Sequence, residues 1–501
     1  MTGSAPETRA ELRTRAVKST AWYSVTRLGI QAVGWATAIL LARYLSPADY
    51  GLFSMSLAVI ALIELLQELG LGVAIVQRHD LSRPQINALF WILTGLSLAV
   101  ATVAVLVAPW AAAWYEEPRI AGLVRVLAAA LVLHAIGLVP YNLLTRELEF
   151  RGRSLAEAAG TIVSALTAVS AAVLGHGVWA LVAGHLARAL VRNAALLAAA
   201  RWRPGLSVSF AGLRDVLRLG LNVSGANLVG TVGGVVRTSV IGRFLGGHDL
   251  GLYEVAASLG QRNPLHKVST SVLNQLSLPM FSKLQRRDDD LRWYFLRISR
   301  YLALLALPMQ VGMAMIAHDL VLVVLTEKWL GAVPLLQVFC LGGILSVLAL
   351  PSTPLLTARG RADLVFRRTT VGTLVSLGAL LAGVPFGLTG VIVAWALTYP
   401  LLRLWLLVQS LLEAGVPAAR YLATIAPAAG ATAAMAIALL LARWLGVPWP
   451  SPYHGIVGEV VIGAVAYALA LLALDRRVIA ECRMVAAALV APAGVRERRW
   501  T

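Results

Sequence analysis

Apolar runs of about 20 residues recur from one end of the chain to the other, separated by short polar connections. A run of this length crosses the hydrocarbon core of a bilayer as an α-helix, because each residue adds about 1.5 Å. Inside lipid, the backbone N–H and C=O groups must be satisfied within the segment, so helices are expected. The pattern predicts an all-α polytopic membrane protein with about fourteen transmembrane helices, at 19–42, 51–75, 86–110, 122–144, 156–174, 178–200, 216–242, 251–278, 298–316, 332–357, 369–386, 388–411, 421–443 and 456–474.

One stretch of the chain occurs twice, 200 residues apart. Residues 42–53 close the first apolar run and open the second, and residues 242–253 do the same for the seventh and eighth runs. Similarity at a fixed spacing predicts an internal duplication. The identical pairs are Arg43/Arg243, Leu45/Leu245, Asp49/Asp249, Gly51/Gly251 and Leu52/Leu252, and two further positions are aromatic in both copies, Tyr44/Phe244 and Phe53/Tyr253.

Six expected spans separate the two copies, and an even number means that both copies cross the membrane in the same direction. The repeat is then parallel, related by an axis along the membrane normal. We expect two pseudo-symmetric six-helix lobes followed by two C-terminal helices. The segments are a cytoplasmic leader at 1–18, a first lobe at 19–214, a second lobe at 215–412, the two further helices at 413–474 and a basic cytoplasmic tail at 475–501.

The net charge of +18 reflects membrane topology rather than binding to nucleic acid. The 501-residue chain is 58% hydrophobic and only 14% charged, whereas soluble proteins carry about 25% charged residues. Most of its 43 Lys and Arg residues fall in the two tails or in alternate connections between the spans. Because such residues concentrate on the cytoplasmic side of membrane proteins, both termini are expected in the cytoplasm.

Several expected spans contain polar or charged residues, which are costly in lipid and usually face a cavity or a partner. In the first and seventh spans these residues repeat at helical spacing and form one stripe on each helix. Two equivalent stripes fit a water-filled cleft between the lobes. The residues expected to line it are Ser24, Gln31, Asn227, Thr231 and Asn274, together with the cations Arg27, Arg237, Arg262 and Lys267.

Other interpretations of these intramembrane residues remain open. The acids Glu64, Glu68 and Glu254 either neutralise the cations, since unpaired charge in lipid is costly, or couple transport to an ion. Arg237 can face the cavity or extend to the interface, and the polar stripes can be packing faces between helices. We expect interface positions for Arg125, Arg188, Arg192 and Arg403, and packed or cavity-lining positions for His134, His185 and His266.

If the cations face the cleft, they outweigh the acids and favour an anionic substrate. Guanidinium groups bind phosphate oxygens through two parallel hydrogen bonds, so a phosphate or pyrophosphate head group suits the cleft. The sequence lacks the G-x-x-x-x-G-K-[ST] motif of ATPases, and its short connections offer no seat for a nucleophile and base. Cys340 and Cys482 define no metal site. We therefore expect a transporter without catalytic residues, metal or cofactor.

Seven stretches between about residues 18 and 410 carry a family resemblance. They read LARYLSPADYGLF at 41–53, LGLGVAIVQR at 69–78, RELEF at 146–150, RPGL at 203–206, LPMFSKLQ at 278–285, EKW at 327–329 and PLLQ at 334–337. In these stretches the chain resembles the lipid-linked oligosaccharide flippases of the polysaccharide transporter family, colanic-acid exporter type. That family lies in the MOP superfamily, which includes multidrug and toxin extruders. After about residue 413 the chain matches the family only in hydrophobicity.

The resemblance implies a two-lobed, V-shaped protein that alternates between inward-open and outward-open states. Its cargo would be an undecaprenyl-pyrophosphate-linked oligosaccharide repeat unit, moved across the bacterial cytoplasmic membrane for exopolysaccharide, capsule or O-antigen synthesis. Relatives hold the pyrophosphate with cations of the first, second, seventh and eighth helices, and Arg27, Arg262 and Lys267 occupy that neighbourhood. The implied partners are this substrate, membrane lipids and the polysaccharide polymerase and export machinery, without nucleic acid.

Two other functions remain open. A cation-coupled multidrug or toxin antiporter of the same fold would depend on acids such as Glu64 rather than on the cations. A polyisoprenyl-glycan polymerase or ligase would need a sizeable outer loop with catalytic residues. The expected connections are too short to form one, so we do not expect an enzyme.

Overall fold

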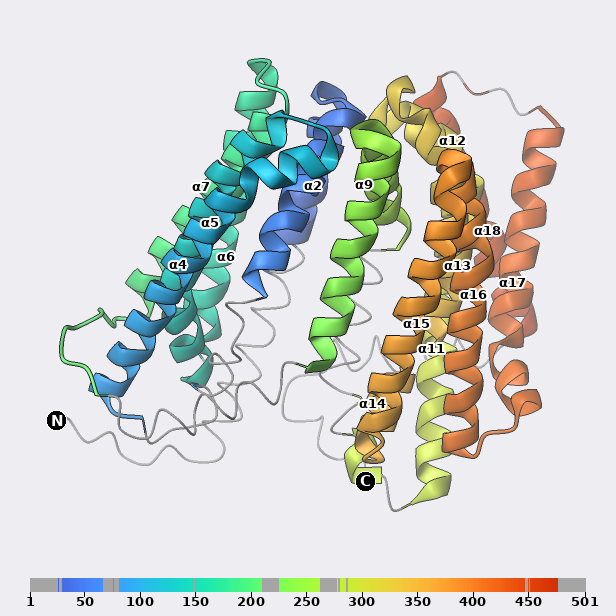
Figure 1. Ribbon diagram of the computed structural model, residues 1–501. Helices are drawn as coiled ribbons and strands as arrows, with labels where there is room; N and C mark the ends of the chain where they lie inside the picture. Colours follow the sequence, from blue (N-terminus) through green and yellow to red (C-terminus); the bar gives the residue numbers. More distant parts are fainter. Residues whose placement is uncertain are drawn as a thin grey trace. The chain divides into compact units, whose positions relative to one another are not determined.

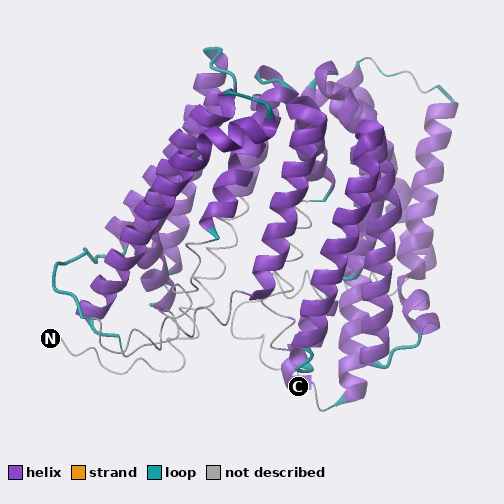
Figure 2. Cartoon of the chain, in the orientation of Figure 1, coloured by secondary structure: helices purple, strands orange, loops and turns teal. Residues whose placement is uncertain are grey.

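All regular secondary structure among the described residues is helical in the computed structural model (Figure 2). The structure describes residues 26, 29–65, 75, 81–147, 149–209, 225–261, 277, 280–284, 287–446, 449 and 451–475. They form two units, which are described separately. The first contains the described residues of 1–255 and 369–391, and the second those of 256–368 and 392–501. The expected all-α polytopic architecture is confirmed.

The first unit is built from long apolar helices, of which α4, α5, α6 and α7 follow one another through short connections (Figure 1). The most extensive packing is between α6 and α7 and between α4 and α5. Gly175 and Gly177 form the turn between α6 and α7 with φ values of 81° and 53°, a conformation that costs glycine little. The helices are α2 (Pro47–Glu64), α4 (Arg83–Tyr115), α5 (Arg119–Arg146), α6 (Phe150–Val173), α7 (Val178–Ala199) and most of α9 (Gly225–Gly260).

The second unit has a core of aromatic and aliphatic side chains between its helices. Trp395 contacts Phe339 with ring centroids 5.5 Å apart and Tyr399 with centroids 4.9 Å apart. Arg403 was expected at the interface. Its guanidinium carbon lies 5.0 Å from the centroid of the Tyr399 ring, which is a cation–π contact. The elements are α11 (Asp288–Met315), α12 (Ala317–Leu320), η1 (Val321–Leu325), η2 (Glu327–Ala332), α13 (Val333–Leu348), α14 (Ser352–Ala358), α15 (Ala362–Gly383), η3 (Val384–Phe386), α16 (Gly387–Ala414), α17 (Ala418–Trp444) and α18 (Pro452–Leu474), of which residues 369–391 belong to the first unit.

The observed helices follow the expected spans closely. Within the described residues, ten helical stretches are long and apolar enough to cross a membrane, and one of them, Asp363–Ala414, contains both α15 and α16. Helix α11 begins at Asp288, ten residues before the expected span, because its first two turns are amphipathic rather than apolar. Helix α9 consists of two helical segments that meet at Gly246, whose φ of 81° and ψ of 178° are not helical, and this break lies inside the expected connection 243–250. The total of fourteen spans stays a prediction, as do the expected lobe boundaries.

Helix α2 begins with a complete capping box. Ser46 Oγ accepts a hydrogen bond from the backbone N–H of Asp49 at 3.2 Å, and Asp49 Oδ2 accepts one from the backbone N–H of Ser46 at 2.9 Å. Pro47 occupies the first helical position, where its missing N–H costs nothing. This local sequence fixes the start of α2 next to the turn that the duplication repeats.

Replacing Ser46 with alanine is expected to lower the free energy of unfolding by about 1 kcal/mol, because one backbone N–H of the first turn loses its acceptor. The thermal midpoint of the purified protein in detergent measures this loss. Ser46→Thr keeps the hydroxyl acceptor and should retain most of the stability. An equal loss in both variants would contradict the capping role.

The two copies of the duplicated stretch cross one another inside the first unit. A Cβ atom added to Gly51 would overlap the carbonyl oxygen of Gly247, and one added to Gly251 would overlap the carbonyl oxygen of Pro47. The contact is reciprocal, since position 51 corresponds to 251 and position 47 to 247. The two backbones can approach this closely because both copies have glycine, which carries no Cβ atom, at the crossing.

Helices α17 and α18 are fastened to the second unit at both ends. Near one end, Arg443 binds Glu459 through Nε at 2.7 Å and Nη2 at 2.8 Å, and its Nη2 also lies 3.1 Å from Asp319. Near the other, Arg300 lies 2.7 Å from Asp475. Tyr467 Oη donates a hydrogen bond to the Leu304 carbonyl between them. The C-terminal helix pair is thus part of the packed second unit.

Candidate functional site

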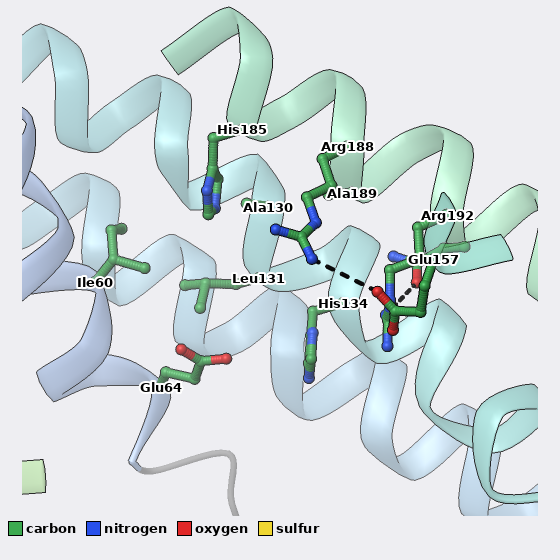
Figure 3. Close-up of a pocket in the computed structure, with 11 residues that line it drawn as sticks. Ile60, Glu64, Ala130, Leu131, His134, Glu157, His185, Arg188, Ala189 and Arg192 are labelled. Atoms are coloured by element: carbon green, nitrogen blue, oxygen red, sulfur yellow. Dashed lines mark hydrogen bonds and ion pairs between the residues drawn. The ribbon is translucent and has the colours of Figure 1, made fainter. Parts of the chain in front are cut away.

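A polar pocket of 330 Å³ lies within the first unit, between α2, α5, α6 and α7 (Figure 3). Helices α2 and α5 contribute apolar side chains together with Glu64 and His134, and the other charged side chains come from α6 and α7. Figure 3 shows Glu64 and His134 on one side, and Arg188, Arg192 and Glu157 facing one another on the other. The lining residues are Ile60, Glu64, Ala130, Leu131, His134, Glu157, His185, Arg188, Ala189, Arg192 and Asn193.

The charges of the pocket are organised around Glu157 of α6. Arg192 Nε lies 2.7 Å from Glu157 Oε1, and Arg188 Nη2 lies 3.6 Å from Glu157 Oε2. The Arg192 side chain is 17% exposed and that of Glu157 is 25% exposed, whereas Arg188 is 50% exposed. Arg188 and Arg192 stand four residues apart, so they project from the same face of α7. One carboxylate therefore receives two guanidinium groups.

Arg192 is held in place by further contacts with its neighbours. Its Nη1 donates a hydrogen bond to Asn193 Oδ1 at 3.0 Å, and Asn193 Nδ2 donates one to the Leu133 carbonyl of α5 at 2.6 Å. Asn193 reaches α5 because Gly137 leaves room: a Cβ at that position would overlap the Asn193 amide. The Arg192 guanidinium also lies 5.3 Å from the centroid of the Tyr141 ring. Three helices, α5, α6 and α7, are thus connected through one polar network.

Two imidazoles and a second carboxylate complete the pocket. His185 of α7 meets the Phe53 ring edge-on, with centroids 6.1 Å apart, and His134 of α5 is exposed. Glu64 is the last residue of α2 and is half-buried. Carboxylate oxygens and the unprotonated nitrogen of a neutral imidazole can accept a proton. Guanidinium groups bind phosphate or carboxylate oxygens. The pocket therefore offers both anion-binding and proton-accepting groups.

The structure describes only some of the residues that were expected to line the cleft. Glu64 lines the pocket, and Gln31 is half-buried on the helix that precedes α2. On α9, Thr231 is exposed and Arg237 is half-buried, and Glu254 accepts a hydrogen bond from Thr238 Oγ1 at 3.4 Å. The backbone of Asn227 is helical in α9. The other expected site residues lie outside the described part of the chain: Ser24, Arg27, Glu68, Arg262, Lys267 and Asn274, as does His266.

Sequence reasoning missed Glu157 and Asn193 as pocket residues. It expected Arg192 near the membrane interface, and the structure shows the Arg192 guanidinium paired with Glu157. Glu157 stands at the second position of the expected span 156–174 and was not among the candidate residues. The sequence does contain a signal for this ion-pair network: one expected span carries an acid, and the next carries two arginines that are one helical turn apart. Arg125 is exposed, and its expected interface position stays a prediction.

No group of three or more His, Cys, Asp or Glu side chains in the described ranges is arranged to hold a metal ion. The charged side chains of the pocket instead satisfy one another.

Comparison with known proteins identifies the family. A family model described as polysaccharide biosynthesis protein matches residues 40–334, which is more than half of the chain. Lipopolysaccharide biosynthesis protein WzxC of Escherichia coli (strain K12) is 25% identical over 374 residues, covering 74% of this chain and 76% of that protein. Teichuronic acid biosynthesis protein TuaB of Bacillus subtilis (strain 168) is 28% identical over 356 residues, covering 69% of this chain and 71% of that protein.

Among solved structures, the fold matches the lipid II flippase MurJ in an inward closed conformation. The TM-score is 0.74 with 13% sequence identity, and the match covers 92% of this chain and 100% of that chain. At this identity the likeness establishes the fold alone. The helical fold and the apolar spans agree on an integral membrane protein. The chain belongs to the polysaccharide biosynthesis protein family and has the fold of the lipid II flippase MurJ.

Proposed function

We propose that the protein is a flippase that moves an undecaprenyl-pyrophosphate-linked oligosaccharide repeat unit across the membrane by alternating access. The family match over residues 40–334 carries this proposal. Relatives named for lipopolysaccharide and teichuronic acid biosynthesis support a role in exopolysaccharide, capsule or O-antigen synthesis. The fold of a lipid II flippase supports translocation of a lipid-linked sugar.

The protein acts in the bacterial cytoplasmic membrane with both termini in the cytoplasm. The distribution of Lys and Arg along the chain supports this orientation. The lipid-linked repeat unit is collected from the cytoplasmic leaflet and released in the outer leaflet. There it meets the polysaccharide polymerase and the export machinery, which are the expected partners.

Cations of the cleft hold the pyrophosphate, and the pocket of the first unit supplies two more. Arg188 and Arg192 present adjacent guanidinium groups that share Glu157. A phosphate oxygen can replace the long Arg188–Glu157 contact without stripping Arg192 of its partner. In the same proposal, Arg27, Arg237, Arg262 and Lys267 bind the pyrophosphate. Ser24, Gln31, Asn227, Thr231 and Asn274 provide hydrogen bonds, and Glu64, Glu68 and Glu254 pair charges or couple an ion.

Translocation of a lipid-linked oligosaccharide in reconstituted vesicles tests this function. The purified protein is expected to move a fluorescent polyprenyl-pyrophosphate oligosaccharide between leaflets, and Arg188→Gln should slow the movement by roughly tenfold, as expected for losing one charge-assisted hydrogen bond. Arg125→Gln removes the same charge from an exposed position of α5 and should move the lipid at the normal rate. Absence of translocation by the intact protein would contradict the proposal.

A cation-coupled multidrug or toxin antiporter is the second candidate function. The observation in its favour is the pair of carboxylates, Glu64 and Glu157, beside two imidazoles in one pocket. This function predicts that Glu64→Gln abolishes drug efflux while Arg188→Gln leaves it intact. Lipid translocation that persists in Glu64→Gln, together with no efflux by the intact protein, would exclude it.

A further inference from the structure

Arg368 is a buried arginine in the second unit, at the start of α15. The residue is 7% exposed, and neither its Nε nor its Nη1 has a hydrogen-bond acceptor in the described part of the chain. A guanidinium group is always charged and carries five N–H donors. Burying it without acceptors is costly, so buried arginines normally face a carboxylate or a phosphate. The position of Arg368 therefore points to an acceptor carried by a bound group.

The acids near Arg368 are already engaged by a second arginine. Arg361 Nη1 lies 3.3 Å from Glu413 Oε1, and Arg361 Nε lies 3.5 Å from Asp363 Oδ1. Glu413 and Asp363 attract the Arg368 charge electrostatically, and Arg361 repels it. Neither acid satisfies the buried Nε and Nη1 groups of Arg368. An additional oxyanion between Arg361 and Arg368 would supply the missing acceptors.

Arg359 presents a further unfilled donor in the same connection. Its Nη2 lies 2.7 Å from Asp288 Oδ1, but its Nε is buried without an acceptor among the described residues. The Arg359–Asp288 contact joins the connection between α14 and α15 to the first turn of α11, and Figure 1 shows these segments at the same edge of the second unit. We call Arg359, Arg361 and Arg368 the arginine cluster.

We propose that the arginine cluster binds the phosphate group of a lipid, with Arg368 as its principal donor. Guanidinium groups bind phosphate oxygens bidentately, and the oxygens of a phosphodiester or pyrophosphate match the free N–H groups of Arg368. Arg368 immediately precedes the apolar run 369–386, which places it at the depth of lipid head groups. Basic pockets between transmembrane helices at this depth suit anionic head groups.

The ends of α15 and α16 also offer apolar surface for acyl or prenyl chains. Phe366 is 47% exposed and Leu412 is 74% exposed, each within two residues of a charged member of this site. A soluble phosphate would gain nothing from these side chains, whereas a lipid would bury them. The ligand is therefore a phosphate-bearing lipid, either an anionic phospholipid or a polyprenyl pyrophosphate. This inference does not require that the protein transport either one.

Thermal stability of the full-length, delipidated protein in neutral detergent tests the site. Phosphatidylglycerol, phosphatidylcholine and undecaprenyl pyrophosphate are added separately to the intact protein, to Arg368→Met and to Arg367→Met. Arg367 is the exposed neighbour of Arg368, so its variant removes the same charge outside the buried position. Phosphatidylglycerol should raise the melting temperature of the intact protein and of Arg367→Met more than phosphatidylcholine does.

Arg368→Met should lose the additional rise in melting temperature that phosphatidylglycerol gives the intact protein. Without lipid, it should melt at or above the temperature of the intact protein, because an uncompensated buried charge has been removed. A lower half-saturating concentration for undecaprenyl pyrophosphate than for phosphatidylglycerol assigns the site to the pyrophosphate lipid, and the reverse order assigns it to the phospholipid. Equal stabilisation by phosphatidylglycerol and phosphatidylcholine with no response to the pyrophosphate, or an undiminished gain in Arg368→Met, would overturn the proposal.

Arg368→Lys provides a second measurement should the methionine variant fail to fold. Lysine keeps the charge but cannot form the planar, two-pronged contact of a guanidinium group. Native mass spectrometry should show phosphatidylglycerol or the pyrophosphate lipid bound roughly tenfold more weakly than to the intact protein, as expected for losing a charge-assisted hydrogen bond. Unchanged lipid binding by this variant would contradict the role of Arg368.

Discussion

Gly51→Ala is expected to destabilise the protein by about 1–3 kcal/mol or more, because the added methyl group would overlap a backbone carbonyl that cannot rotate away. The carbonyl belongs to Gly247, in the second copy of the duplicated stretch. Gly251→Ala should have a similar effect, since its methyl group would overlap the Pro47 carbonyl in the reciprocal contact. The melting temperature in detergent and the rate of lipid translocation measure both variants.

The double variant, Gly51→Ala with Gly251→Ala, distinguishes an effect on this backbone crossing from unrelated defects. Once the first methyl group has forced the two backbones apart, the second should cost less, so the two effects should not add. Gly95→Ala is the matched control, because nothing lies within 4 Å of a Cβ atom at that position of α4. It should be neutral or slightly stabilising, as alanine favours helices over glycine. Normal stability in Gly51→Ala would show that the crossing is not a close contact in the membrane.

Glu157→Gln is expected to lower the free energy of unfolding by roughly 1–3 kcal/mol and to impair transport. Arg192 would lose its charged partner at 2.7 Å, and Arg188 would lose its contact at 3.6 Å. Leaving a largely buried cation without its partner costs more than the pair contributes. The remaining exposure of both side chains keeps the loss below the value of a fully buried pair. Chemical or thermal unfolding in detergent, alongside the vesicle assay, measures the two effects.

Glu116→Gln is the matched control for this pair. Glu116 and Arg243 also lie 2.7 Å apart, but the Glu116 side chain is 70% exposed. Water screens such a pair, so its loss should cost less than about 1 kcal/mol. Combining Glu157→Gln with Arg192→Gln should recover part of the lost stability, because the unpaired charge is removed as well. Equal effects of the two Glu→Gln variants would show that the Glu157 network contributes no more than a surface pair.

The positions of the helices could be predicted from the sequence because lipid imposes a simple rule. A backbone in a bilayer must satisfy its own hydrogen bonds, so apolar length alone marks a span. Helices α5 and α7 begin and end within three residues of the expected spans 122–144 and 178–200. The start of α11 was missed because its first turns are amphipathic and lie outside any apolar run. The break in α9 at Gly246, with φ 81° and ψ 178°, falls inside the expected connection 243–250.

The candidate site could be predicted only in part, because charge placement along a helix does not reveal which way a side chain turns. Glu64 was recognised as an intramembrane acid, and the structure places it in the pocket. Arg192 was assigned to the interface from its distance to the end of its span. Its partner, Glu157, lies 35 residues away on another helix, and only the packing of α6 against α7 brings them together.

The sequence by itself determined the fold class, the approximate spans and the family resemblance, because each depends on local composition or on motifs that are contiguous in the chain. Only the tertiary structure decided that the duplicated stretches cross at Gly51 and Gly251, that Glu157 gathers Arg188 and Arg192, and that Arg368 is buried without acceptors. These features depend on distances between residues far apart in the chain. Such distances are set by how helices pack, which no single stretch of residues specifies.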